Sequence, residues 1–158
     1  MLFIGIDPGA SGGIAALGDT GVVRAISNRP ETCRDLLDFL VKISEGQDAH
    51  AMLEKAVPFS RPRPGHGMIG TSTAFKIGIG YGELRAMLTA ARIPFDEVAP
   101  QTWQKEMNSK TGGDKNVSKR RAQELFPGQH VTHATADALL ISEYCRRVVG
   151  ARGPKGLL

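Results

Sequence analysis

Cysteine is rare in this chain, which has only Cys33 and Cys145 among 158 residues. The two lie far apart, and their spacing fits neither a zinc-binding motif nor a disulfide framework. Long apolar runs are also missing, so no segment reaches the length of a membrane span. The N-terminal residues lack the basic and apolar regions of a signal peptide. The sequence therefore predicts reduced thiols, a cytoplasmic location and no membrane partner.

Acidic residues are scarce in the C-terminal two-thirds of the chain. Residues 1–54 carry four Lys and Arg against eight Asp and Glu, whereas residues 55–158 carry sixteen against eight. A basic region beside acidic strand ends favours a polyanionic partner that is approached through metal ions. The alternative is a solvated basic surface without a partner.

Short apolar runs separated by glycine-containing turns predict three antiparallel strands, at residues 2–7, 13–18 and 22–27. An amphipathic helix at 30–44 then leads to a strand at 49–53, which the crossover connection makes parallel to the first strand. Further helices are expected at 71–91, 117–126 and 134–149, a fifth strand at 95–99, and the start of a short helix at 100–103. The prediction is an α/β fold with a five-stranded mixed sheet, three antiparallel strands followed by parallel strands, flanked by helices. A length of 158 residues fits a single domain, expected over 1–150 with a tail at 151–158.

Three carboxylates lie inside otherwise apolar segments. Asp7 follows the first apolar run, Glu54 follows the fourth predicted strand, and Asp137 lies in the first turn of the last helix. Each has an ordinary explanation by itself: a turn residue, an ion pair with Lys55, or a charge at a helix N-terminus. Parallel neighbours bring their carboxyl ends to one sheet edge, so Asp7 and Glu54 are predicted to meet there. With Asp137 they could hold Mg²⁺, and two such ions can activate water and stabilise the leaving oxygen of a phosphodiester.

His133 precedes Asp137 by four residues, a spacing that places both on one helical face. It could orient the attacking water, bind a metal ion or act as a general base. Alternatively, it caps the start of the helix or packs against Trp103.

The order and spacing of several short motifs resemble the RuvC-type Holliday-junction resolvases, in particular the small phage-encoded members. The resemblance runs from Phe3 to Arg147. Its motifs are Gly5-Ile6-Asp7-Pro8-Gly9, Leu53-Glu54, Ala74-Phe75-Lys76-Ile77-Gly78 with Gly82, Pro100-Gln101-Thr102-Trp103, Thr111-Gly112-Gly113-Asp114-Lys115 and Ala136-Asp137-Ala138-Leu139.

The resemblance implies an RNase H-like fold in which Asp7, Glu54 and Asp137 bind the catalytic metals. It also implies a homodimer, with the helix that carries Gly78 and Gly82 near the active site and the dimer interface. A glycine lets another backbone approach closely. Two positions depart from the family pattern. Bacterial members carry an acid or His where this chain has Ala134, and members often carry an aromatic wedge where it has Val57.

The residues predicted to contact DNA are basic, apart from one aromatic. They are Phe59, Arg61, Arg63, Lys76, Lys110, Lys115, Lys119, Arg120 and Arg121. Phe59 is the nearest aromatic after Glu54, so it is the candidate wedge for opening a junction, unless it packs inward under its loop. Lys115 and its neighbours match the basic segment that contacts DNA in the family.

The sequence thus predicts a metal-dependent endonuclease that resolves Holliday junctions and other branched DNA by symmetric nicking, in a bacterial or phage-infected cell. Two Mg²⁺ ions are expected in each active site, with Mn²⁺ as a substitute. The alternative is an RNase H-like nuclease that cuts RNA–DNA hybrids or structured RNA. An actin-like ATP-binding module needs a second domain and far more chain. A catalytically silent DNA-binding protein would not need all three carboxylates.

Overall fold

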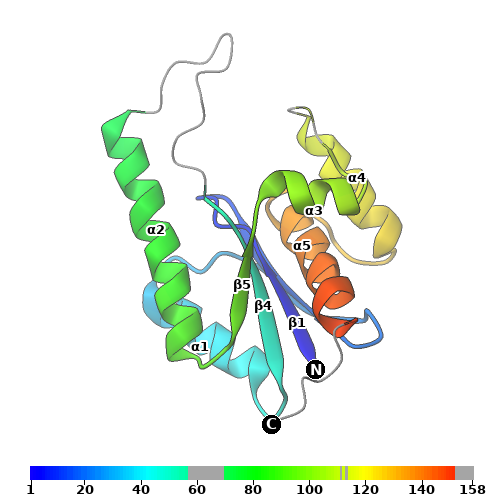
Figure 1. The fold of residues 1–158 in the computed structure, drawn as a ribbon, viewed down its shortest axis with the longest axis horizontal. Coiled ribbons are helices and arrows are strands. Elements are labelled where there is room, and N and C mark those ends of the chain that lie inside the picture. The colour runs from blue at the N-terminus through cyan, green and yellow to red at the C-terminus, as the bar shows by residue number, and fades with distance from the viewer. Residues whose placement is uncertain (57–69, 111, 113, 152–158) are drawn as a thin grey trace.

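The computed structural model describes residues 1–56, 70–110, 112 and 114–151 (Figure 1). Within these residues lie the strands β1 (Leu2–Ile6), β2 (Gly13–Gly18), β3 (Val23–Asn28), β4 (Ala49–Glu54) and β5 (Phe95–Val98). The helices are α1 (Cys33–Ser44), α2 (Thr71–Ala90), α3 (Pro100–Glu106), α4 (Lys115–Leu125) and α5 (His133–Gly150). None of the helices in the described ranges is both long enough and apolar enough to cross a membrane.

The strands form one sheet in the order β3-β2-β1-β4-β5. Strands β1, β2 and β3 are joined by short turns and pair antiparallel, whereas β4 and β5 follow helices and join the sheet parallel to β1. The predicted five-stranded mixed sheet is therefore confirmed. In the parallel register Ile6 lies opposite Leu53, so the residues that follow them leave the sheet side by side.

Helices cover both faces of the sheet, which explains why every residue of β1 and β2 is buried. Alternate residues of β1 point to opposite faces. Leu2, Ile4 and Ile6 pack in a core with α1 and α2, while Phe3 packs in a second core with α3, α4 and α5. Figure 1 shows α1 and α2 on one side of the sheet and α3, α4 and α5 on the other.

Gly5 lets α5 lie directly against β1. A Cβ atom built on Gly5 would collide with the backbone of α5, at the carbonyl of Ala138 and the amide of Ser142. Since neither backbone group can rotate away, only glycine fits at this crossing. The close contact fixes the depth at which α5 packs on the sheet.

Hydrogen-bonding side chains set several helix starts. Thr32 accepts a bond from Asp35 N, so α1 begins at Cys33 and the predicted start at Pro30 is wrong. Thr132 and Thr135 form a reciprocal capping box at the start of α5. These caps decide the first residue of each helix, which apolar periodicity alone does not specify.

Candidate active site

Asp7 follows the last residue of β1 and is held by the glycine-rich turn. Its amide donates to the carbonyl of Gly13 (3.0 Å), and its Oδ1 accepts from the amide of Gly9 (2.9 Å). A Cβ atom on Gly12 would collide with the Asp7 carbonyl and lie 2.9 Å from its Cγ. The absence of a side chain at Gly12 therefore lets the turn fold closely around the carboxylate.

Glu54 ends β4, the parallel neighbour of β1. Side chains alternate between the two faces along a strand, so the Glu54 side chain lies on the same face as that of Met52, which α3 and α5 cover. Trp103 on α3 is fully buried, and its Nε1 donates a 2.6 Å hydrogen bond to Glu54 Oε2. This hydrogen bond holds Oε2 of Glu54 toward Trp103 and so fixes the orientation of the carboxylate.

Asp137 lies on α5, one residue before the Ala138 carbonyl that packs against Gly5. The electrostatic environment ties it to the other two carboxylates. Burial raises the pKa of Glu54 from 4.5 to about 7, a hydrogen bond from Trp103 opposes the rise, and the negative charges of Asp7 and Asp137 add to it. The three carboxylates thus share one electrostatic site at the carboxyl ends of β1 and β4.

The donor chemistry of this site fits Mg²⁺, which prefers oxygen ligands, and a cation would neutralise the repulsion that raises the Glu54 pKa. In the described part of the chain, however, no group of three or more His, Cys, Asp or Glu side chains is arranged to hold a metal ion. The link between the three carboxylates in this structure is therefore electrostatic, through the effect of Asp7 and Asp137 on the Glu54 pKa.

His133 is the first residue of α5, and its side chain is exposed. The alternative that it caps the helix is wrong, because Thr132 and Thr135 form the cap. Its four-residue spacing from Asp137 within one helix keeps both on the same face. A catalytic role for His133 remains a prediction.

The predicted DNA contacts fall into three groups. Phe59, Arg61 and Arg63 lie outside the described residues, together with the position of the family wedge. Lys76 is exposed on α2, Lys110 is exposed after α3, and Lys115 opens α4. Further along α4, Arg120 is exposed and Lys119 is half-buried.

Arg121 differs from the other basic residues of α4 because it has partners within the fold. Its Nε donates to the carbonyl of Met107 and its guanidinium donates to Glu124, each at 3.0 Å. A phosphate contact by Arg121 would have to replace these bonds. The structure therefore favours a structural role for Arg121 and leaves Lys119 and Arg120 as the stronger DNA-binding candidates of this helix.

The first half of α2 exposes an apolar surface. The side chains of Phe75 and Ile79 are 69% and 47% exposed. Cβ atoms on Gly78 and Gly82 would meet no described atom within 4 Å. The close backbone approach predicted for these glycines thus has no partner among the described residues of this chain.

Two residues at the site are not among the predicted functional residues. Trp103 was expected only as part of a motif and as a packing partner, yet it bonds to Glu54. Arg29 was not singled out at all, although its guanidinium donates to the carbonyl of Pro8 beside Asp7. Their partners are 49 and 21 residues away, so no local pattern pairs them.

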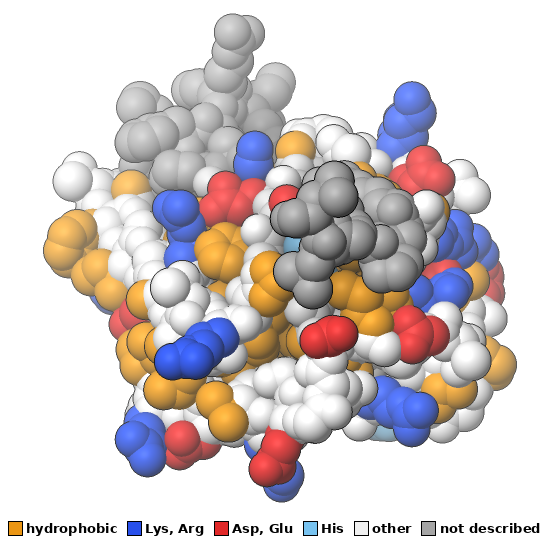
Figure 2. Space-filling view, turned by 60° about the horizontal axis from the view of Figure 1, so that its bottom comes forward, with side chains coloured by type: hydrophobic (Ala, Val, Ile, Leu, Met, Phe, Trp, Pro, Cys, Tyr) orange, Lys and Arg blue, Asp and Glu red, His pale blue; other side chains and the backbone are white. Residues whose placement is uncertain are grey.

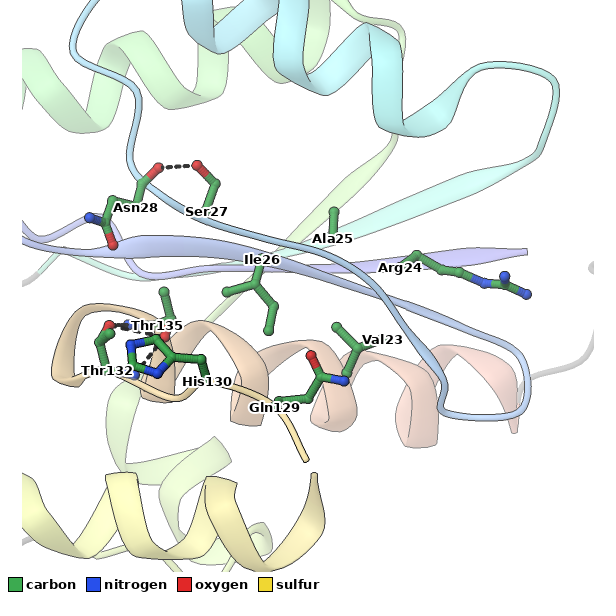
Figure 3. Close-up of a pocket in the computed structure, with 10 residues that line it drawn as sticks. All are labelled: Val23, Arg24, Ala25, Ile26, Ser27, Asn28, Gln129, His130, Thr132 and Thr135. Atoms are coloured by element: carbon green, nitrogen blue, oxygen red, sulfur yellow. Dashed lines mark hydrogen bonds between the residues drawn. The ribbon is translucent and has the colours of Figure 1, made fainter. Parts of the chain in front are cut away.

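A groove of about 580 Å³ runs along β3 and the segment that leads into α5 (Figure 3). Its lining includes Arg24, Asn28, Gln129 and His130. Figure 3 shows Asn28 and Thr132 toward one end and Arg24 at the other. None of the three carboxylates lines this groove, so it is separate from the candidate active site.

No model of a known protein family matches this sequence, and no curated protein matches it. The fold is, however, similar to that of solved structures. "T. thermophilus RuvC in complex with Holliday junction substrate" aligns over 98% of this chain and 96% of that chain, with a TM-score of 0.64 and 15% identity. "Thermus thermophilus RuvC structure" aligns over 96% of both chains, with a TM-score of 0.58 and 15% identity. The chain therefore has the RuvC variety of the RNase H-like fold, as the motifs predicted.

Proposed function

We propose that this protein is a metal-dependent endonuclease that resolves Holliday junctions and other branched DNA by symmetric nicking. One observation carries the proposal: the charges of Asp7 and Asp137 raise the pKa of Glu54, in a fold that is similar to RuvC over nearly the whole chain. The first of the two RuvC structures contains a Holliday junction substrate. The finer assignment, to the small phage-encoded members, rests on the sequence motifs. A cytoplasmic location rests on the two widely spaced cysteines and the lack of signal-peptide features.

The three carboxylates would hold Mg²⁺, two ions in each site, with Mn²⁺ as a substitute. Bound ions of this kind lower the pKa of water and neutralise charge on a scissile phosphate. Trp103 would keep Glu54 oriented through its Nε1 hydrogen bond. His133 would accept the proton of the attacking water, for which an exposed imidazole at the start of α5 is accessible.

Basic residues flank this edge. Figure 1 shows the start of α2 and the start of α4 at the same end of the molecule as the carboxyl end of β4. Lys76 lies near the first of these starts, and Lys110 and Lys115 lie near the second. We assign phosphate binding to these residues because each can neutralise one phosphate.

The exposed face of α2 supports a homodimer. Phe75 and Ile79 are exposed apolar side chains, and the nearby glycines leave room for another backbone. Figure 2 shows hydrophobic side chains on the side of the molecule where α2 lies. A two-fold dimer would present two active sites to a junction of approximate two-fold symmetry. Sedimentation of a Phe75→Asp/Ile79→Asp double variant tests this: we expect a monomer, and an unchanged dimer would move the interface elsewhere.

The alternative substrate is an RNA–DNA hybrid or structured RNA, which the same carboxylates would cleave. A panel of a mobile four-way junction, a flap, a hybrid and a linear duplex separates the two activities. With Mg²⁺ we expect two nicks placed symmetrically on opposing strands of the junction, and none with Ca²⁺, whose larger and irregular coordination shell permits binding without tight geometry. Preferential cutting of the hybrid would replace the proposal with the alternative.

A further inference from the structure

Arg29 joins two elements that are far apart in the sequence. Its guanidinium donates to the carbonyl of Pro8 in the glycine-rich turn (3.3 Å). It also donates to the carbonyl of Gly80 (3.1 Å) and to the carboxylate of Glu83 (3.0 Å), both on α2. The Arg29 side chain is only 16% exposed, so its guanidinium is largely shielded from water, although the Glu83 side chain is 40% exposed.

The chemistry of this position suits arginine. A guanidinium offers five donors in a rigid planar fork and can serve several acceptors at once, whereas an ammonium acts as a point charge. Gly80 completes the fit, because a Cβ atom there would lie 2.9 Å from an Arg29 nitrogen. Of the glycines in α2, Gly80 is the one whose missing side chain makes room for a described group of this chain.

On the turn side, Arg29 reaches the same loop that holds Asp7. The backbone amide of Arg29 donates to the carbonyl of Gly12 (2.9 Å), and Gly12 packs on the Asp7 carboxylate. Pro8, the acceptor of the guanidinium, follows Asp7 directly. Arg29 therefore bonds to both sides of the turn that sets the direction of the Asp7 side chain.

On the helix side, Arg29 bonds to α2 where the helix leaves the core. Only Leu84 and Leu88 of α2 are buried, and both lie in its second half. That half is also tied to β5 by the Arg85–Glu97 ion pair (3.2 Å). The described residues of the first half are exposed or half-buried, so the bonds to Gly80 and Glu83 hold the helix where apolar burial ends.

We propose that Arg29 is a positioning residue that fixes the Asp7 turn against α2, so that the seating of α2 determines how well Asp7 is placed to bind metal. This inference rests on the proposed function. It predicts that any partner or substrate that shifts the first half of α2 also changes the placement of Asp7. Outer-shell residues of this kind typically change metal affinity or activity by about 10- to 100-fold when they are substituted.

The test compares Arg29→Lys and Arg29→Gln with Glu83→Gln, which loosens only the helix side. Arg34→Gln is the matched control, since Arg34 forms an ion pair of the same length with Asp38 but is 81% exposed on α1. Three quantities are measured: the Mn²⁺ dissociation constant of the DNA-free protein, the rate of junction nicking, and amide hydrogen exchange of the metal-free protein.

We expect both Arg29 variants to weaken Mn²⁺ binding by about tenfold or more and to slow nicking. Amide exchange should become faster in the turn at residues 8–12 and in the first half of α2, while Arg34→Gln matches the wild type. Glu83→Gln should accelerate exchange in α2 and weaken Mn²⁺ binding by a smaller factor.

Wild-type metal binding and nicking by Arg29→Lys would overturn the inference, because charge alone would then suffice. A lower melting temperature of the Arg29 variants with unchanged Mn²⁺ affinity would also overturn it, since the role would be only structural. If the wild-type protein cuts no branched DNA, the proposed function fails. Hydrogen exchange needs neither metal nor DNA and still decides whether Arg29 couples the turn to α2.

Discussion

The helices α5 and α2 cover opposite faces of one sheet, yet they are attached to it very differently. Nine of the 18 residues of α5 are buried, and Gly5 lets its backbone touch β1. Only two of the 20 residues of α2 are buried, and its first half exposes Phe75 and Ile79. The helix that carries a candidate catalytic carboxylate is thus the one fixed most firmly, while the other helix presents a surface.

This difference has a physical reason. Metal-binding carboxylates need placement within a fraction of an ångström, which close backbone packing supplies. A surface for a partner needs accessible side chains and therefore cannot be buried in the monomer. Arg29 connects the carboxylate site with the α2 surface, because it bonds to the turn that holds Asp7 and to α2. Substitutions on the two faces and between them test and sharpen this comparison.

The largest effect is expected at the α5 face. Asp7→Asn, Glu54→Gln and Asp137→Asn should each lower nicking by more than about 100-fold, because each removes one negative ligand. Junction affinity measured with Ca²⁺ should change little. Asp38→Asn, an exposed acid on α1, is the isosteric control. Wild-type nicking by any of the three variants would remove that residue from the site.

Gly5→Ala should lower the free energy of unfolding by about 3 kcal/mol or more, measured by denaturant titration. The added methyl group would be forced into the backbone of α5 at Ala138 and Ser142, neither of which can move aside alone. A loss below about 1 kcal/mol would mean that α5 can lift from the sheet, and the comparison of the two helices would fail.

Glu54 makes the stability of the metal-free protein depend on pH. Folding raises the Glu54 pKa from 4.5 to about 7, so its contribution is fully present below pH 4.5 and is lost as the pH rises to about 7. The loss amounts to at most about 3 kcal/mol. Unfolding titrations across this range should show the decline in the wild type and not in Glu54→Gln. Identical pH profiles would disprove the shift.

Metal binding provides a second readout of the same group. Because binding requires the carboxylate form, the affinity of the wild type for Mg²⁺ should increase with pH up to about 7. Trp103→Phe removes the hydrogen bond that lowers the Glu54 pKa, so its profile should shift to higher pH. A shift to lower pH would contradict the assigned role of Trp103.

The α4 helix should separate DNA binding from folding. Lys119→Ala/Arg120→Ala should flatten the dependence of log affinity on log salt by about two units, at about 0.9 per phosphate contact. Arg121→Ala should leave the slope nearly unchanged and reduce stability by about 1 kcal/mol, because its bonds are internal. An unchanged slope in the double variant would make these residues a solvated helix face.

The smallest effect is expected at the α2 face. Gly82→Ala should raise the free energy of unfolding of the monomer by about 0.5–1 kcal/mol, because alanine favours a helix and nothing described lies within 4 Å. Gly82→Ala is the same substitution as Gly5→Ala, but its expected effect on the free energy of unfolding has the opposite sign. A clear destabilisation of the isolated monomer would show that the face of α2 packs within the chain.

Local signals in the sequence were enough to predict the order of strands and helices and to bring Asp7 and Glu54 to neighbouring strand ends. Apolar runs, turn glycines and one crossover are local signals, and a parallel pair necessarily brings Asp7 and Glu54 to the same edge. The cap at Thr32 moved a helix start by three residues, since capping competes with periodicity within a single turn.

The side chains that support these strand ends could not be predicted, because they depend on how the helices pack on the sheet. Trp103 reaches Glu54 from 49 residues away, Arg29 reaches Gly80 from 51 residues away, and Arg121 turns back to Met107. These bonds depend on the depth at which each helix packs on the sheet, and that depth is set by contacts such as α5 against Gly5. No local pattern contains this information, because an arginine or tryptophan with a distant partner looks the same in sequence as one without.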